Sequence, residues 1–231
     1  MRGNLEHRYY SKSRGQQIQI QFLIGFGALL LVLMAFLVSW STGIYLIGIL
    51  VFSIVLSIIA PFFDVPSLRE SGKLRYHSWL FLSEPEKNGL VKVHGGTLFD
   101  YVFVIDRKLN GKARQRLIIQ QYLEGLLHLI AENEKQQADE RLIRGTSYII
   151  NERTARKIGF KRVKTDYLQK LILLYNFFNV LISASIAKGK LAFPKLKDIQ
   201  TFEASLGELV KRKAYISSLN EQLKTAMPQA V

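Results

Sequence analysis

The sequence predicts a membrane protein, a two-helix transmembrane hairpin plus an α+β cytoplasmic domain with a small antiparallel sheet and three longer helices. The first observation is that residues 22–63 contain no Lys, Arg, Asp or Glu, although the chain has 32 basic and 18 acidic residues. The second is that residues 64–231 mix charged, apolar and turn-forming segments, as globular domains do. The uncharged window therefore separates a membrane segment from a domain of about 165 residues.

Two apolar stretches within this window each approach the ~20 residues that a helix needs to cross a bilayer. They run from Phe22 to Ser39 and from Ile44 to Ala60, and only residues 40–43 lie between them. So short a link requires two antiparallel, neighbouring helices. We expect Pro61 and Pro66 to end the second helix, because proline lacks the N–H that a helix interior uses.

Basic residues flank the hairpin on both sides, and the link has none. Three precede the first span and three follow the second: Arg8, Lys12, Arg14, Arg69, Lys73 and Arg75. The positive-inside rule then predicts an integral protein of the inner or plasma membrane with both termini cytoplasmic. A cleaved signal peptide is the alternative, but the apolar core is too long for one and a second span follows at once.

Five segments follow from these patterns: a basic N-terminal segment (1–21), the hairpin (22–63), a linker (64–73), an α+β domain (74–197) and a C-terminal amphipathic helix (198–231). Alternating and β-rich stretches predict strands over 74–82, 90–94 and 97–105, which would form the small antiparallel sheet. Apolar periodicity predicts a helix over 112–135 that packs against this sheet.

Shorter elements are predicted in the second half of the domain. They are a strand over 145–150, a helix over 152–158 with Asn151 as its N-cap and Gly159 at its end, and a strand over 160–164. The segment 166–187 is a strongly apolar helix, so a third membrane span is one possibility. A polar stripe of Asn176, Asn179 and Ser183 favours instead a central helix of a packed domain.

A dense basic cluster is the strongest candidate site. The part of the chain after the hairpin has 28 basic and 17 acidic residues, a net charge of +11. Anionic lipid headgroups, a phosphorylated ligand or nucleic acid would suit such a cluster, and a solvated surface is the alternative. Nucleic acid is disfavoured because no aromatic residues for base stacking interleave the cluster. Its members are Arg153, Arg156, Lys157, Lys161, Arg162 and Lys164.

The C-terminal helix has a heptad-like seam, with polar Lys213 and Asn220 among apolar positions. This seam predicts contact with a protein partner or a second copy, and packing on its own domain is the alternative. The residues that we expect to contact the partner are Phe202, Leu206, Leu209, Ile216 and Leu223.

Two weaker patterns were weighed as sites. His94-Gly95-Gly96 is similar to loops that bind an oxyanion, with Asp100 nearby, but no Gly-x-Ser-x-Gly elbow occurs. Glu124, His128 and Glu132 share one helical face, but one helix cannot complete a metal site alone. The chain has no cysteine, which excludes disulfides and thiolate chemistry, and we expect no cofactor and no metal.

Residues 151–160, Asn-Glu-Arg-Thr-Ala-Arg-Lys-Ile-Gly-Phe, resemble the late helix-to-strand segment of acetyltransferases of the GNAT family. Those proteins often show Asn, then Ala, then Gly-Phe at this spacing. The Gln/Arg-x-x-Gly-x-Gly/Ala loop with which the family binds pyrophosphate is not found upstream. No residue role is therefore carried over from the family.

Two functions are compatible with the sequence. The first is a membrane-anchored, cytoplasmic-face adaptor or assembly protein that binds anionic lipid headgroups or an acidic partner. The alternative is an enzyme acting on a lipid-linked or phosphorylated substrate at the inner membrane face. The enzyme would use His94, Asp100 and the basic cluster, so it requires these groups to meet in one pocket.

Overall fold

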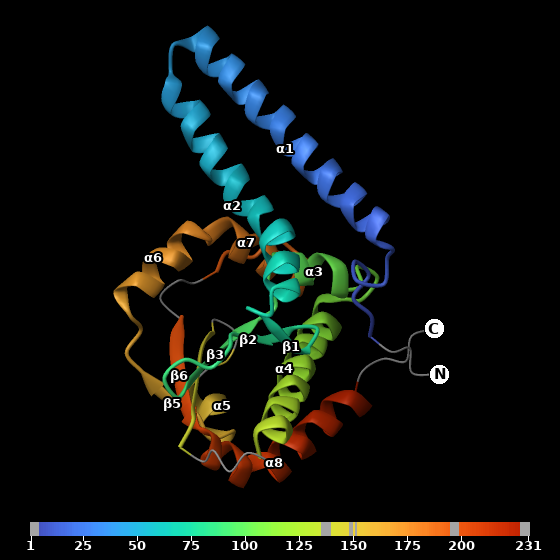
Figure 1. Cartoon of the computed structure of the whole chain (residues 1–231), viewed down its shortest axis with the longest axis vertical. Helices are drawn as coiled ribbons and strands as arrows, with labels where there is room; N and C mark the ends of the chain where they lie inside the picture. Colours follow the sequence, from blue (N-terminus) through green and yellow to red (C-terminus); the bar gives the residue numbers. More distant parts are fainter. Residues whose placement is uncertain (1–4, 135–139, 148–149, 151, 195–198, 227–231) are drawn as a thin grey trace.

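A long helical hairpin projects from a mixed α/β domain (Figure 1). The structure is a computed structural model that describes residues 5–134, 140–147, 150, 152–194 and 199–226. Helices α1 (Arg14–Thr42) and α2 (Tyr45–Glu70) form the hairpin, and both are long and apolar enough to cross a membrane. The chain reverses at Gly43, whose φ of 72° favours glycine.

Helix α2 does not end at its prolines. It continues through Pro61 and Pro66 to Glu70, so the prediction of a helix end there was wrong, and most of the expected linker is helical. Phe62 and Val65 are buried in one cluster with Phe99. This packing against the domain explains why the last turns remain helical despite the lost N–H groups.

The sheet is larger than predicted and mixed. Its six strands lie in the order β1-β2-β3-β4-β6-β5, and only the β3–β4 pair of these described strands is parallel. Three of them come from after residue 140, so the prediction of a small antiparallel sheet within 74–105 was wrong. The strands are β1 (Arg75–Ser78), β2 (Phe81–Ser83), β3 (Leu90–Gly95), β4 (Leu142–Ser147), β5 (Lys161–Val163) and β6 (Gln200–Ser205).

Two predicted elements changed type. Residues predicted as a strand over 97–105 form helix α3 (Leu98–Val104), because Thr97 and Asp100 make a capping box at its start. The beginning of the predicted final helix is strand β6. Helix α8 (Leu206–Thr225) starts at Leu206, where Ser205 is the N-cap and its hydroxyl accepts a hydrogen bond from the Glu208 N–H. In both cases a cap decides where the helix begins.

Other predictions agree with the structure. Helix α4 (Gly111–Glu134) lies within one residue of its predicted bounds and packs against β1, β2 and α8. Helix α5 (Glu152–Lys157) and strand β5 follow the expected pattern, and Gly159 between them has a φ of 100°. The predicted cap Asn151 lies outside the described residues.

The predicted single helix over 166–187 is broken. Helix α6 (Tyr167–Tyr175) and helix α7 (Phe177–Lys188) meet at Asn176 with a bend of 69°. Helix α7 packs against α2, α3 and α4, as expected for a central helix. Helix α6 has no buried residue. Both lie at the end of the domain nearest the hairpin (Figure 1).

Candidate functional site

A pocket of about 370 Å³ opens at the point where β3 and β4 separate. The two strands pair in parallel, from the Leu90/Leu142 pair to the Val93/Gly145 pair. Beyond it, β3 stays paired with β2 as far as Gly95, and β4 stays paired with β6 as far as Ser147. The sheet therefore divides into two halves at this point, and the pocket lies between the carboxyl ends of the two parallel strands.

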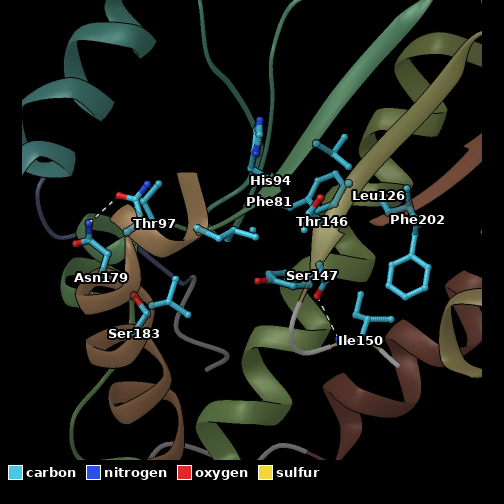
Figure 2. A pocket seen from close by; sticks show the side chains of 18 of the residues that line it. Phe81, His94, Thr97, Leu126, Thr146, Ser147, Ile150, Asn179, Ser183 and Phe202 are labelled. Carbon is cyan, nitrogen blue, oxygen red and sulfur yellow. Dashed lines mark hydrogen bonds between the residues drawn. The ribbon is translucent and has the colours of Figure 1, made fainter. Parts of the chain in front are cut away.

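The walls of the pocket are unequal in polarity. Phe81, Leu126, Ile150 and Phe202 come from the sheet, α4 and the segment after β4, and Figure 2 shows them together on one side. Asn179 and Ser183 of α7 lie on the opposite side in the same view, with Thr146 and Ser147 of β4 between. The pocket thus has an apolar wall facing a neutral polar one.

The hairpin and α6 complete the pocket. Pro61 of α2 and Leu173 of α6 are among the lining residues. Asn179 donates from Nδ2 to the Ser57 carbonyl of α2 at 2.6 Å, and Gln169 of α6 donates to Thr146 Oγ1 at 2.6 Å. The hairpin is therefore attached directly to the rim of the pocket.

The His94-Gly95-Gly96 segment lines this pocket, but it does not form an oxyanion site. The His94 ring points away from Ser147 and Ile150 (Figure 2), and its Nε2 lies 2.8 Å from Glu84 Oε1. This contact lowers the pKa of the Glu84 carboxyl. The Gly96 N–H already donates to the Leu80 carbonyl. A Cβ on Gly95 would lie 2.1 Å from the Tyr122 hydroxyl, so glycine is required there by close packing.

Asp100 is fully buried in a hydrogen-bonded cluster and does not line the pocket, although its partners Tyr76 and Thr97 are only partly buried. Its carboxylate accepts hydrogen bonds from the Thr97 N–H and hydroxyl and from the Tyr76 hydroxyl, and His7 Nε2 lies 3.3 Å away. Burial, with the Asp100 charge, raises the pKa of the Tyr76 phenol, so this phenol stays neutral and donates. Since Asp100 and His7 are 0% exposed, the cluster joins the N-terminal segment to α3 and has no access to a substrate.

The aromatic residues of the N-terminal segment were missed by the sequence interpretation. Tyr9 is buried among Phe99 and Phe62, and the Arg69 guanidinium stacks 3.8 Å above the Tyr10 ring. Within the segment predicted as a basic extension, His7, Tyr9 and Tyr10 are therefore packed into the domain, whereas residues 11–16 are exposed. Its run of His and Tyr, unusual in a solvated tail, was the available signal.

Glu124, His128 and Glu132 on α4 do not converge on one position where they could bind a metal ion together. Glu124 pairs with Lys224 of α8, His128 Nδ1 contacts the His77 carbonyl at 2.6 Å, and Glu132 pairs with Arg75. Burial alone would raise the pKa of Glu124, but hydrogen bonds from Gln120 and Lys224 outweigh burial and lower it. Among the described residues, no group of three His, Cys, Asp or Glu is arranged to hold a metal.

The basic cluster lies away from the pocket interior. All six side chains are exposed, whereas Ala155, Ile158 and Phe160 of the same segment point inward and line the pocket. Glu152 pairs with Arg156 and lies 3.6 Å from Arg162, so part of the charge is compensated. The enzyme alternative required His94, Asp100 and the basic cluster to meet in one pocket. In the structure they do not meet.

The C-terminal seam is occupied by the chain itself. Helix α8 packs against α4, which explains why its apolar residues form a periodic stripe. The predicted contact with a partner does not agree with this packing, because the residues assigned to it are buried or packed against the domain core: Phe202, Leu206, Leu209, Ile216 and Leu223.

Helix α6 carries an exposed apolar surface that the sequence interpretation did not single out. Only Gln169 and Leu173 of this helix are partly buried. We call the remaining large apolar residues the α6 apolar surface, and their exposed fractions range from 45 to 73%: Tyr167, Leu168, Leu171, Ile172, Leu174 and Tyr175. A solvated helix would show polar residues there.

Comparisons with known proteins add no assignment. A scan of protein-family models, a search of curated proteins and a search of solved structures each found no match.

Proposed function

We propose that this chain is a membrane-anchored adaptor or assembly protein of the cytoplasmic membrane face. The hairpin spans the bilayer with both termini in the cytoplasm, and the α6 apolar surface lies in the lipid headgroup region. The observation that carries the proposal is this surface, placed at the end of the domain nearest the hairpin (Figure 1).

The physical argument concerns what covers the α6 apolar surface. Contiguous exposed apolar patches mark contacts with a protein or a membrane. A membrane is already adjacent, because α6 continues into α7, which packs against α2. Amphipathic helices of this kind lie in the membrane interface with their apolar face toward the acyl chains. The bilayer therefore covers the surface without requiring a further molecule.

The same orientation selects between the two partners expected for the basic cluster. Helix α5 lies beside α8, where Gly159 approaches Arg212, at the end of the domain away from the hairpin (Figure 1). Headgroup attraction falls off within about a Debye length of the membrane, roughly 8–10 Å. The α5 members of the cluster are thus better placed for an acidic protein partner, whereas Lys164, three residues before the start of α6, lies within reach of anionic headgroups.

Single-cysteine spin labelling tests the membrane contact, since the chain has no cysteine of its own. Leu171→Cys on α6 and Lys211→Cys on α8 would each be labelled in full-length protein in lipid vesicles. We expect the label at 171 to be accessible to oxygen and protected from a water-soluble nickel chelate, and the label at 211 to show the reverse. Equal exposure of both labels to the chelate would refute the α6 contact.

Cysteine labelling in intact cells tests the topology. A membrane-impermeant maleimide should react with Ser41→Cys in the hairpin link and leave Ser11→Cys unmodified until the cells are opened. The opposite pattern would place both termini outside and remove the cytoplasmic assignment.

An enzyme at the inner membrane face is a second candidate. Ligands in sheets with parallel strands bind beyond the carboxyl ends of the strands, where this pocket lies. The segment that resembles GNAT acetyltransferases forms α5 and β5 at its edge. Two observations count against a phosphorylated substrate. No described lining residue is Lys or Arg. The N-terminus of α4 is covered, because the Lys188 carbonyl lies 2.1 Å from the place that a Cβ on Gly111 would occupy. A lipid-linked substrate fits better.

Calorimetry with the purified full-length protein tests whether the resemblance to GNAT acetyltransferases reflects function. Because acetyl-CoA carries phosphates and no described lining residue is Lys or Arg, we expect no heat of binding up to millimolar acetyl-CoA. Saturable binding would instead favour an acetyltransferase, and either outcome leaves the adaptor proposal unaffected.

A further inference from the structure

We infer that the pocket between β3 and β4 binds the hydrocarbon chain of a membrane lipid or fatty acid, with the carbonyl end of the chain toward α7. The site itself rests on the pocket lining, whereas the bilayer as the source of the ligand rests on the proposed membrane contact of the hairpin and α6. The shared chemistry is one long apolar chain that ends in a neutral or acidic carbonyl group.

The lining excludes most other ligand classes. Of the described lining residues, none is Lys, Arg, Asp or Glu, so phosphates and strongly charged ligands find no counter-charge among them. Phe81, Leu126 and Phe202 lie deep in the domain core, where water would find few hydrogen-bond partners. At about 370 Å³ the cavity is within the range of ligand pockets, roughly 300–1,000 Å³.

The polar side of the pocket suits the end of such a chain. Asn176, Asn179 and Ser183 are spaced three and four residues apart, with Val180 beside them, so the first turns of α7 present one face to the pocket. The hydroxyl of Ser183 is a hydrogen-bond donor on this face. Asn179 Nδ2 already donates to Ser57 and Asn176, but Asn179 Oδ1 has no hydrogen-bond partner among the described residues and can accept from a protonated carboxyl group. The Ser183 hydroxyl can donate to a carboxyl or ester carbonyl without demanding a full charge.

The route of entry points to the bilayer as the source. Pro61 of α2 and Leu173 of α6 both belong to the lining and lie on the two elements nearest the membrane. Leu173 faces inward from a helix whose other large apolar residues form the exposed α6 apolar surface. A chain leaving the bilayer beside α2 therefore meets the apolar side chains of Pro61 and Leu173 in the pocket wall.

Photo-crosslinking of the full-length protein in phosphatidylcholine vesicles tests this site. Two probes are used in separate arms: a phosphatidylcholine with a diazirine in its acyl chain, and a free diazirine fatty acid. We expect label in the tryptic peptide 145–153, which contains Thr146, Ser147 and Ile150. Labelling by the phospholipid alone identifies a bilayer lipid, and labelling by the fatty acid alone identifies a free acid.

Pocket-filling variants separate occupancy of the cavity from general lipid contact. Val180→Trp, which adds a large side chain toward the cavity, should reduce labelling of 145–153 at least about fivefold. Leu181→Trp, one residue along on α7 and outside the lining, is the matched control and should label like the wild type. If Val180→Trp does not fold, Ser183→Leu serves the same purpose with a smaller change.

The inference fails if peptide 145–153 takes up no label, or if its labelling is unchanged in a folded pocket-filling variant. It also fails if label appears only on the hairpin and α6, which would show lipid outside the pocket. That last result would leave the α6 membrane contact intact, so the two proposals fail separately.

Discussion

Helices α6 and α7 are adjacent in the chain and similarly apolar, yet their environments are opposite. Helix α7 buries Asn179, Ser183, Ala184 and Ala187 and so turns polar and small residues toward the protein. Helix α6 buries no residue and exposes Leu and Tyr side chains. A soluble domain would show the reverse on α6. The difference shows that α7 is a domain helix, whereas α6 is shaped for an apolar environment outside the domain.

Introducing a charge should give the largest contrast between the two helices. Ala184→Arg places an unpaired cation among buried residues and should cost about 3 kcal/mol or more. For a chain of this size, that lowers the thermal midpoint by roughly 6–12 °C. The matched variant Leu171→Arg on α6 should change stability in detergent by no more than about 0.5 kcal/mol. Scanning fluorimetry of both proteins measures this, and equal losses would mean that α6 is also packed.

Removing the polar contact between α7 and the hairpin should have a smaller effect. Asn179→Ala deletes the donor to the Ser57 carbonyl and leaves that buried acceptor without its partner, at a cost of about 1–3 kcal/mol. Thermal unfolding in detergent measures it, with Lys188→Ala, an exposed position on the same helix, as a control. A control variant that loses as much as Asn179→Ala would contradict a specific role for the α2 contact.

The link between α6 and the sheet is weaker still. Gln169→Ala removes the hydrogen bond to Thr146 Oγ1 and should cost about 0.5–1.5 kcal/mol. Because α6 has few other inward contacts, a spin label at Leu171→Cys should become more mobile in this background. Lys170→Ala, which alters an exposed neighbour, should leave the label unchanged. An immobile label in the Gln169 variant would show that lipid contact alone holds α6.

Acid should weaken the domain without moving α6. Burial lowers the pKa of His77, and this effect outweighs the nearby Glu132, while Arg75 and His128 also lower it. The unfolded chain therefore takes up the proton first, from about pH 6.5 downward. The stabilisation that comes from burying neutral His77 is present above this pH and is lost as the pH falls. His77→Gln should reduce the fall in thermal midpoint between pH 7.5 and 5.5, and an unchanged fall would assign it to other groups.

Much of the fold was predictable wherever the signal is local. The hairpin followed from one charge-free window, and helix α4 followed from its periodic apolar face. The start of α3 could also have been predicted, because Thr97 and Asp100 have capping-box spacing. The β-rich composition of the segment led instead to the wrong prediction of a strand. Strand β6 was missed since Phe202 continues the apolar stripe of α8.

The candidate site was less predictable than the fold. The lining residues Phe81, Leu126 and Phe202 are far apart in sequence, and each alone resembles an ordinary core residue. The basic cluster was recognisable as a cluster, but only the structure shows that its side chains point outward while Ala155 and Phe160 point inward. The orientation of a short segment depends on what packs against it.

The sequence by itself determined that this chain has two apolar helices joined by a short link, each long enough to cross a membrane, and a charge-rich remainder after them. Those features depend on hydropathy, charge and length, which are local and nearly additive along the chain. Only the tertiary structure decided that β3 and β4 pair in parallel and then separate, and that the chain bends at Asn176. Both depend on contacts between segments distant in sequence, and these contacts put an apolar pocket at the base of the hairpin and α6 on the outside.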